Sequence, residues 1–583
     1  ATNYSYDALG RLTALAYSDG QNTTYSYDTL RVGALSSITG GGATLNYTYT
    51  PEGFVKTVSQ ITGTLTKTLD YTWDSSGKVM SVVTPSGQTI SFSYPPKGTQ
   101  PSSVTLNGTN LISQVTWLPF SATPTGWLWA NGTAHQRLVD LAGRTKKVET
   151  LGVLSRTLTR DAVGNPVKIT DAQNAARTQT LTYNFLDSLL TEKNGLGRND
   201  RFGYDWNYNR YSVTKDSTGA NGYSYGYTGS QLTSVTHNAT YATNSLAYDP
   251  TGNLTQDSTR AFNYDARGRM TSMTKNNKTT EYYYNGLGQR FSKNGVIYMY
   301  DLQGHLIGEY TNTGALIQET VWLNDLPIAT IRPNGNGIPV YFVHADELGT
   351  PRVVTDSTNK PVWRWDGDAF GRGLPNQDPL KSGIKFVYHL RYPGQYYDTE
   401  SGLHYNYFRD YDPETGRYIQ SDPIGLAGGF NTYAYVGGNP ILYADPLGLD
   451  RWGSDPSLKQ IPNTAANVQN WLAQAIQKNP SDPYGYLFNA RNIYRLDGYD
   501  DNLAAAERYT GAYSGDPLYN DIFLVGDLFL KLARNVCVGS LCGSDIFGKN
   551  GSKDGEFVNR WGSLGNFDRQ YGLPYRGKNQ CQQ

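Results

Sequence analysis

Tyr6-Asp7-Ala8-Leu9-Gly10-Arg11-Leu12 is the first copy of a seven-residue phrase that recurs along most of this chain. The phrase joins an aromatic residue to Asp, two variable positions, Gly, a basic or polar residue and an apolar residue. Close copies begin at Trp73, Tyr248, Tyr264 and Tyr300, and degenerate copies occupy 140–144, 161–165 and 284–290. Between copies the sequence alternates, as in Thr24-Tyr25-Ser26-Tyr27. A period of two predicts β-strands with one buried face.

Each Asp-x-x-Gly unit predicts a hairpin turn between two such strands. The Asp side chain accepts hydrogen bonds from backbone N–H groups two residues on, and Gly adopts the positive φ that the turn needs. Copies spaced by about 20 residues predict hairpins that stack only on their neighbours and form a ribbon that winds. A simple β-sandwich with similar turns is the alternative, but sandwiches do not repeat a turn phrase so literally.

The composition favours an all-β first part and argues against two classes of protein. The 583 residues include 63 Gly, which mark turns, and 46 Tyr, which favour strands. Fifty Lys+Arg balance 50 Asp+Glu, which argues against a generally basic nucleic-acid binder and a polybasic membrane-surface protein. No apolar run approaches the ~18 residues of a membrane-spanning helix.

The first residues, ATNYSYDALG, contain neither Met nor a charged-then-apolar leader. We therefore expect no signal peptide in this chain and a start inside a longer precursor.

The repeated phrase resembles the tyrosine–aspartate (YD) repeats of the RHS (rearrangement hotspot) family, which has relatives among bacterial toxin complexes and animal teneurins. The resemblance covers most of residues 1–449. It implies a mainly β fold in which the repeats spiral into a hollow shell, the β-cocoon. This shell is shorter than those that close in the family, so an upstream segment or a partner polypeptide is expected to complete the wall.

The end of the repeat region carries the predicted chemistry. Residues 391–450 read RYPGQYYDTESGLHYNYFRDYDPETGRYIQSDPIGLAGGFNTYAYVGGNPILYADPLGLD and resemble the RHS-associated core. The block contains two Asp-Pro-x-Gly-Leu phrases, 422–426 and 445–449, whose aspartates are 23 positions apart. In the family this region is an aspartyl-type self-cleaving protease that cuts after the Leu of the second phrase, here between Leu449 and Asp450. An isolated Asp-Pro-x-Gly is only a good turn, but two copies directly before a change of composition favour the protease.

Two neighbouring carboxylates suit this reaction because they cannot both ionise easily. The charged carboxylate can activate a water while the protonated one polarises the scissile carbonyl, so the mechanism requires no His, Ser or metal. Asp422 and Asp445 are the predicted pair. Arg409 matches an Arg that the family carries upstream of the first Asp, and its implied role is to hold a carboxylate or stabilise the oxyanion. Asp412 and Arg417 are interpreted as turn and wall residues.

After residue 449 the phrase never recurs and the periodicity becomes helical. An apolar stripe with helical spacing runs through Val468, Trp471, Leu472, Ala475 and Ile476. Asp482-Pro483 predicts the start of a second helix that reaches Tyr494, and Asp516-Pro517 predicts the start of a third.

We therefore predict three domains: a YD-repeat shell at 1–380, an RHS-associated core with the protease at 381–449, and a mainly α (α+β) domain at 450–583. In RHS proteins the last segment is a variable toxin that is unrelated between members. The resemblance thus implies a toxin and does not identify its reaction.

The composition of the tail excludes some reactions. Residues 451–583 contain no His, which argues against His-dependent nucleases, Cys–His proteases and HExxH metalloproteases. The three cysteines, Cys537, Cys542 and Cys581, lack the paired signature of a zinc deaminase, and we interpret Cys537 and Cys542 as a reduced pair. Fourteen Lys+Arg against 13 Asp+Glu do not support tight nucleic-acid binding, although a nuclease could use a local patch.

Three His-free activities remain for the tail. Transfer of ADP-ribose would require NAD as a cofactor, and glycan cleavage would require two carboxylates. The candidate residues are Arg491, Tyr513-Ser514 and Glu556 for the first, and Glu507 with Asp516 or Asp521 for the second. Membrane disruption by 522–532 is the third, but Asp527 and Lys531 interrupt that stretch and favour a buried helix. We expect no cofactor for the shell and no metal site.

The whole pattern predicts an RHS effector whose shell cuts off, encloses and delivers the C-terminal toxin. The expected partners are the enclosed tail, a cognate immunity protein, and a secretion machinery or an upstream segment that completes the shell. Delivery into target cells by a bacterial type VI or toxin-complex system is the expected route. The alternative is a non-catalytic, teneurin-like adhesive or scaffold shell, which explains the repeats but leaves the protease block idle.

Overall fold

The computed structural model describes residues 2–96, 98–119, 121–215, 221–335 and 337–453, together with 537–538 and 541–542. The chain divides into two compact units, residues 1–470 and 471–583. Within the described residues the helical pieces are three short 3-10 turns: η1 (Ala175–Arg177), η2 (Gly425–Gly428) and η3 (Val436–Gly438). The predicted mainly β class of the shell is confirmed. The helices predicted for the tail lie outside the described residues, and the predicted domain limits stay predictions.

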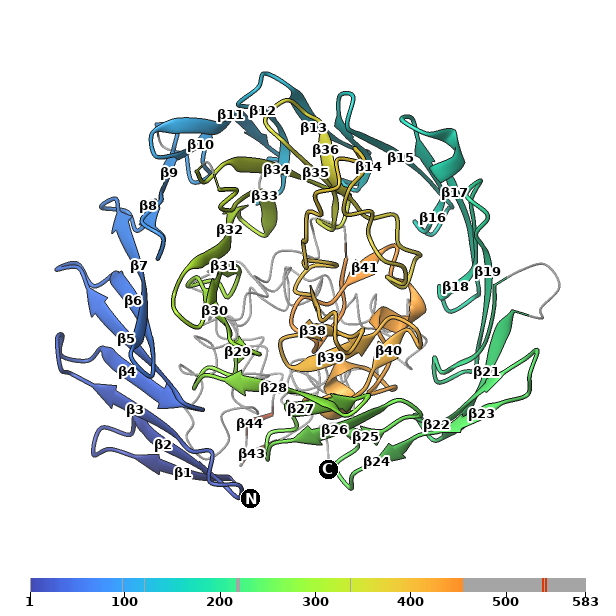
Figure 1. Ribbon diagram of the computed structural model, residues 1–583. Helices are drawn as coiled ribbons and strands as arrows, with labels where there is room; N and C mark the ends of the chain where they lie inside the picture. The colour runs from blue at the N-terminus through green and yellow to red at the C-terminus, as the bar shows by residue number, and fades with distance from the viewer. Residues whose placement is uncertain are drawn as a thin grey trace. The chain divides into compact units, whose positions relative to one another are not determined.

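The first 23 strands form one antiparallel sheet in which each strand pairs with the next along the chain. They are β1 (Thr2–Tyr6), β2 (Leu12–Tyr17), β3 (Thr23–Tyr27), β4 (Leu35–Gly40), β5 (Ala43–Tyr49), β6 (Val55–Thr62), β7 (Leu65–Trp73), β8 (Val79–Val83), β9 (Thr89–Ser93), β10 (Ser103–Leu106), β11 (Thr109–Trp117), β12 (Pro124–Trp129), β13 (Ala134–Val139), β14 (Thr145–Thr150), β15 (Leu154–Arg160), β16 (Pro166–Asp171), β17 (Gln179–Tyr183), β18 (Leu189–Lys193), β19 (Asn199–Tyr204), β20 (Arg210–Thr214), β21 (Gly222–Thr228), β22 (Gln231–His237) and β23 (Thr243–Ser245). Figure 1 shows this sheet as a curved outer wall, coloured from blue to green.

A second sheet of 13 strands continues the hairpin sequence. In Figure 1 its first strands cross the lower edge of the ring, and its later strands lie inside the outer wall. Its strands are β24 (Ala247–Tyr248), β25 (Leu254–Gln256), β26 (Arg260–Tyr264), β27 (Met270–Lys275), β28 (Lys278–Tyr284), β29 (Arg290–Lys293), β30 (Val296–Tyr300), β31 (Leu306–Thr311), β32 (Leu316–Leu323), β33 (Leu326–Ile331), β34 (Val340–Ala345), β35 (Pro351–Thr355) and β36 (Pro361–Arg364).

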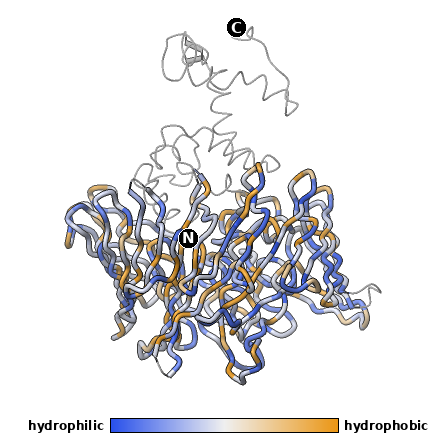
Figure 2. The backbone as a smooth tube through the Cα atoms, turned by 90° about the horizontal axis from the view of Figure 1, so that it is seen from above, coloured by the Kyte–Doolittle hydropathy of each residue, from blue (hydrophilic) through white to orange (hydrophobic). Residues whose placement is uncertain are grey.

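The hydrophobic core lies between these two layers. One buried cluster joins Val104 and Trp129 of the outer sheet to Val321 and Phe342 of the inner sheet. A second cluster joins residues of β4–β8 to residues of β30 and β31. Strands of the outer wall such as β5 alternate buried and partly exposed positions, so hydrophobic and hydrophilic residues are interleaved along the wall (Figure 2). Inner strands are buried on both faces where the layers meet, as in β33.

The chain then turns inward into a compact core, drawn in yellow and orange inside the curve of the wall in Figure 1. This core contains β37 (Tyr396–Tyr397), β38 (His404–Asn406), β39 (Arg409–Asp412), β40 (Arg417–Tyr418), η2, η3, β41 (Tyr443–Ala444) and β42 (Trp452–Gly453). Its Phe370 and Ile441 belong to a cluster with residues of β15–β22 of the wall. In the second unit, β43 (Cys537–Val538) and β44 (Leu541–Cys542) form a short ladder with Cys537 opposite Cys542.

The YD turn is built from hydrogen bonds within its own phrase. In the first copy, Asp7 Oδ1 accepts from the backbone N–H groups of Leu9 and Arg11, both at 2.9 Å, and Gly10 has a φ of +75°. Arg11 Nε donates to Asp7 Oδ2 at 2.7 Å, which explains the basic residue after Gly. The same pairing within one turn recurs at Lys78, Arg144 and Arg269.

An aromatic residue at the end of a strand often ties its hairpin to the preceding one, and we call this contact the aromatic–carbonyl link. Tyr27 Oη donates to the Leu12 carbonyl at 2.9 Å, and Tyr49 Oη donates to the Leu35 carbonyl at 2.6 Å. The link recurs from Trp73, Tyr94, Trp117, Tyr183, Tyr227, Tyr264, Tyr284, Tyr300 and Trp322. Tyr and Trp suit this position because each carries a polar donor at the end of a large apolar ring.

Replacing Tyr284 by Phe should destabilise the shell because it removes one aromatic–carbonyl link and leaves the ring in place. Tyr284 is buried, and its Oη donates to the Met270 carbonyl at 2.8 Å. Leaving that carbonyl without its donor is expected to cost about 1–2 kcal/mol. The matched control is Tyr283→Phe, because the neighbouring Tyr283 is 45% exposed. Thermal unfolding measures the effect, and equal melting temperatures of the two variants would contradict the role given to the link.

Candidate active site

Three predicted site residues come together from separate segments of the core. Arg409 is the first residue of β39, Asp422 lies between β40 and η2, and Asp445 directly follows β41. Their exposed fractions are 3%, 6% and 3%, so the three charged groups are removed from bulk water. Burial of this kind makes each charge depend on its neighbours.

A single guanidinium nitrogen contacts both aspartates. Arg409 Nη2 lies 2.8 Å from Asp422 Oδ2 and 3.4 Å from Asp445 Oδ2. Arg409 Nε donates to the Gly448 carbonyl at 2.5 Å, and Nη1 donates to the Thr432 carbonyl at 3.0 Å. Arg409 therefore holds the two carboxylates and the backbone just before the predicted cut.

The peptide between Leu449 and Asp450 lies against both carboxylates. Asp445 Oδ1 accepts from the N–H of Leu449 at 3.0 Å and from the N–H of Asp450 at 3.2 Å. On the other side, a Cβ placed on Gly428 would lie 2.3 Å from Asp422 Oδ2 and 2.5 Å from the Leu449 carbonyl oxygen. The missing side chain at Gly428 thus lets these two oxygens approach the same point. Asp445 is next to the peptide nitrogen, and Asp422 is next to the carbonyl.

The two carboxyl groups differ in how well their charged forms are stabilised. Burial raises the pKa of Asp422 to about 7, and the ion pair with Arg409 opposes the shift only in part. Burial also raises the pKa of Asp445, against the opposing effects of Arg409 and Tyr418. Asp445 accepts from Tyr418, Arg409 and two backbone N–H groups, whereas Asp422 accepts from Arg409 and one backbone N–H. These contacts favour the charged form of Asp445 more than that of Asp422, so Asp422 is the group of the pair that more readily takes up a proton.

Tyr418, Asn406 and Gly428 belong to the site but were not singled out from the sequence. Tyr418 Oη donates to Asp445 Oδ2 at 2.7 Å, and the Tyr418 ring centroid lies 3.7 Å from Arg409 Cζ. Asn406 Nδ2 donates to Tyr418 Oη at 2.8 Å and to the Asp445 carbonyl at 2.7 Å. In a chain with 46 Tyr, nothing in the spacing distinguishes Tyr418; its only signal is its place inside the quoted block.

Asp412 and Arg417 contact the wall, as the sequence predicts. Asp412 Oδ1 accepts from the Glu414 N–H in its own turn, and Oδ2 pairs with Arg260 of β26 at 2.9 Å. Arg417 Nη2 donates to the Ser230 carbonyl. Neither residue contacts the Leu449–Asp450 peptide in these interactions.

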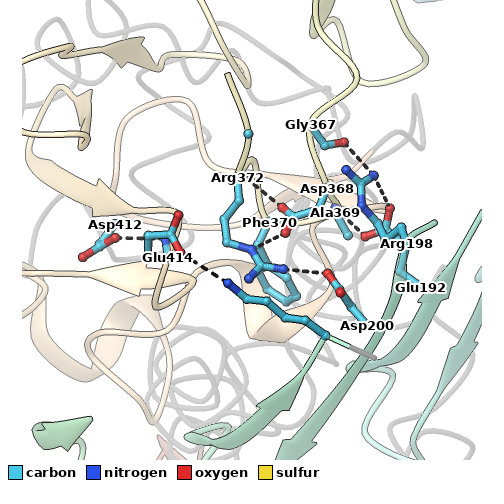
Figure 3. A network of polar contacts seen from close by, with 12 residues as sticks. Glu192, Arg198, Asp200, Gly367, Asp368, Ala369, Phe370, Arg372, Asp412 and Glu414 are labelled. Carbon is cyan, nitrogen blue, oxygen red and sulfur yellow. Dashed lines mark hydrogen bonds and ion pairs between the residues drawn. The ribbon is translucent and has the colours of Figure 1, made fainter. Parts of the chain in front are cut away.

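A separate network of polar contacts fixes the loop at 366–372 to the outer wall (Figure 3). Arg372 Nη2 lies 2.6 Å from Asp200 Oδ2 of β19. The Ala369 N–H donates to Glu192 Oε2 of β18 at 2.7 Å. The wall therefore positions the segment that leads into the core, and with it the frame on which the aspartates are held.

The described part of the chain contains no group of three or more His, Cys, Asp or Glu side chains that could hold a metal ion. In the same residues, no helix is long and apolar enough to cross a membrane. The tail candidates Arg491, Glu507, Ser514 and Glu556 lie outside the described residues. The reactions assigned to them, and the need for NAD, stay predictions.

The Teneurin YD-shell family profile matches residues 1–115 and 139–441. The chain belongs to this family. The identification of an RHS/YD-repeat shell from the repeated phrase is therefore confirmed.

Curated relatives include bacterial toxins. The chain is 31% identical over 240 residues to Double-stranded DNA deaminase toxin A of Burkholderia cenocepacia. This alignment covers 35% of this chain and 16% of the relative. It is 43% identical over 110 residues to Toxin protein Tse5 of Pseudomonas aeruginosa. This alignment covers 19% of this chain and 8% of the relative. Probable deoxyribonuclease RhsA of Dickeya dadantii is 32% identical over 206 residues, covering 32% of this chain and 14% of the relative. The chain thus spans less than a fifth of the length of these relatives.

Solved structures with a similar fold come from toxin complexes. The Photorhabdus luminescens Tc holotoxin pore has a TM-score of 0.56 and 17% identity, covering 77% of this chain and 27% of that chain. TcdB2–TccC3 without its hypervariable C-terminal region has a TM-score of 0.56 and 18% identity over the same shares. These likenesses confirm the shell fold.

Proposed function

We propose that this protein is an RHS-family toxin effector whose core hydrolyses the Leu449–Asp450 bond of its own chain and thereby frees the C-terminal segment as a toxin. The proposed self-cleavage rests on the position of the Leu449–Asp450 peptide. Its N–H donates to Asp445, and its carbonyl oxygen lies beside Asp422. Family membership and the toxin relatives support the release of the C-terminal segment as a toxin.

Asp422 acts as the acid in the proposed reaction. With a pKa of about 7, the Asp422 carboxyl group is protonated in about half of the molecules at neutral pH and in more of them at lower pH. It lies next to the Leu449 carbonyl oxygen. A hydrogen bond from this carboxyl group polarises the carbonyl and stabilises the negative charge that develops on its oxygen. Arg409, at 2.8 Å from Asp422, adds positive charge at the same place.

Asp445 acts as the base and then returns the proton. Water attacks the Leu449 carbonyl carbon as Asp445 takes one of the water's protons. The C–N bond breaks as that proton passes to the Asp450 nitrogen, which lies 3.2 Å from Asp445 Oδ1. Leu449 keeps the water oxygen in its new carboxyl group, and Asp450 becomes an amino terminus. Tyr418 stabilises the charged form of Asp445 throughout.

The proposed role of the shell is to enclose the freed tail and to deliver it into a target cell. The deaminase, nuclease and Tse5 names belong to the relatives, and ADP-ribose transfer or glycan cleavage are our candidates for the tail of this chain. A cognate immunity protein and a type VI or toxin-complex delivery system are part of the proposal. The alternative, a teneurin-like adhesive shell, shares the family and needs no cut.

Asn at either aspartate should leave the chain covalently whole. Asp422→Asn removes the acid, and Asp445→Asn removes the base, while both keep the size and hydrogen-bonding shape of the side chain. Denaturing electrophoresis should show fragments of about 450 and about 134 residues for the wild type, the lengths set by the quoted motif, and one band for each variant. Asp450→Ala should still cut, because the Asp450 side chain adds only to the raised pKa of Asp422, as the last of its causes, and exchanges no proton in the proposed reaction. Cutting that persists in both Asn variants would exclude the carboxylate pair.

Cutting should slow as the pH rises above about 7, the pKa to which burial raises Asp422. The protonated form of Asp422 is present below that value and is lost as the pH rises through it, so the rate should fall about tenfold per pH unit. Cell-free synthesis at a permissive pH followed by a pH jump measures the rate. Asp410→Asn is the control, because burial also raises the pKa of Asp410 to about 7 although its partner is Gln420. The assignment of Asp422 as the acid would be contradicted if the fall in rate above pH 7 disappeared in Asp410→Asn. It would also be contradicted if the wild-type rate did not depend on pH.

Expression of residues 450–583 alone separates the toxin from the adhesive alternative. A toxin should arrest or kill a bacterial or eukaryotic host, and paired Glu507→Gln and Glu556→Gln variants then test glycan cleavage and ADP-ribose transfer. Growth of the host unchanged by well-expressed tail would favour the adhesive shell. The matched control is residues 1–449 expressed at the same level, which should have no effect on growth.

A further inference from the structure

The residues directly after the proposed cut are bound to the core by contacts of their own. β42 pairs with β41, with Tyr443 opposite Gly453 and Ala444 opposite Trp452. The Arg451 guanidinium carbon lies 5.0 Å from the centroid of the Tyr443 ring. Arg451 also lies close to Gly437: a Cβ added to this glycine would be 3.3 Å from Arg451 Nη1. None of these contacts uses the Leu449–Asp450 bond, so hydrolysis of that bond leaves them intact.

Hydrolysis would add an ion pair to this set. The Asp450 nitrogen already lies 3.2 Å from Asp445 Oδ1 as a neutral amide donor. After the C–N bond breaks, the nitrogen takes up a further proton and becomes an α-ammonium at the same position. A charge-assisted hydrogen bond from an ammonium to a buried carboxylate is about twice as strong as a neutral one. The cut thus strengthens the contact between Asp445 and the end that it creates.

We infer that residues 450–453 form a latch that keeps the cut tail on the shell. The receiving surface consists of β41, the Tyr443 ring and Asp445, and its partner is the free amino-terminal segment of the tail. This inference rests on the proposed self-cleavage. Because the Arg451 guanidinium lies over the Tyr443 ring, the surface favours an amino-terminal peptide with a basic second residue.

The latch is small, so it releases its partner without unfolding of the shell. It comprises a ladder of two residue pairs, one cation–ring contact and one ion pair. A two-stranded ladder of this length is marginal by itself. Its ionic part requires the α-ammonium to stay protonated. A free amino terminus titrates near roughly pH 8, and pairing with a carboxylate moves that pKa upward.

Release of the cut tail from the full chain tests the inference. Three proteins are incubated in guanidinium below the unfolding range of the shell: the wild type, Arg451→Ala and Tyr443→Leu. Size exclusion separates released tail from the shell, and denaturing electrophoresis quantifies it. Both variants should release the tail about two- to fivefold faster, the factor expected for loss of one partly exposed cation–ring contact. Lys78→Ala is the matched control, because Lys78 lies over the Tyr94 ring at the same 5.0 Å and far along the chain.

Raising the pH tests the ionic part in the wild type. Retention should be lost as the pH passes above the raised pKa of the α-ammonium, because the neutral amine no longer pairs with Asp445. Equal release from all four proteins, or release independent of pH between roughly 7 and 10, would overturn the latch while leaving the cut itself in place. A wild-type chain that is never cut would overturn the proposed function as well as the latch.

Discussion

The recurring hydrogen bond from a turn aromatic to the carbonyl of the preceding hairpin is the contact on which the rest of the structure depends. A single Asp-x-x-Gly hairpin has only one apolar face and cannot form a core alone. The aromatic–carbonyl link fixes the offset between successive hairpins, as from Tyr27 to Leu12 and from Tyr49 to Leu35. With that offset repeated, the ribbon curves until its inner strands pack on its outer ones. The buried clusters between the two sheets are a consequence of this geometry.

The wall in turn makes the carboxylate pair functional. Buried carboxylates are costly, and two that share a cation are stable only if the surrounding frame is held rigidly. The frame here is the inward core, anchored by an ion pair to β19, by a backbone hydrogen bond to Glu192 of β18, and by packing of Phe370 against the wall. Burial supplies the raised pKa of Asp422, and Tyr418 keeps the charge on Asp445. The same enclosure that stabilises the shell thus separates the roles of two identical side chains.

The sequence predicted the features that depend on local chemistry. Asp and Gly at fixed spacing predict the turn, alternation predicts the strands, and the resemblance identified Asp422, Asp445 and Arg409 before their contacts were known. Contacts between distant segments were not predictable in this way. Tyr418 and Asn406 look like any other Tyr and Asn of the repeats, and the need for Gly at 428 arises only because the Leu449 carbonyl and Asp422 approach it from elsewhere. The aromatic–carbonyl link was not predicted from the sequence for the same reason, since it joins neighbouring hairpins.

The central claim is that a water molecule, held between two unequal carboxyl groups, hydrolyses the Leu449–Asp450 bond. Synthesis of the full chain in oxygen-18 water, followed by denaturation and mass spectrometry of the intact fragments, tests it most directly. The account predicts one fragment that ends at Leu449 with one added oxygen-18 atom in its terminal carboxyl group, and a second fragment that begins at Asp450. A chain that stays whole, a cut at another bond, or a Leu449 terminus without the label would contradict it.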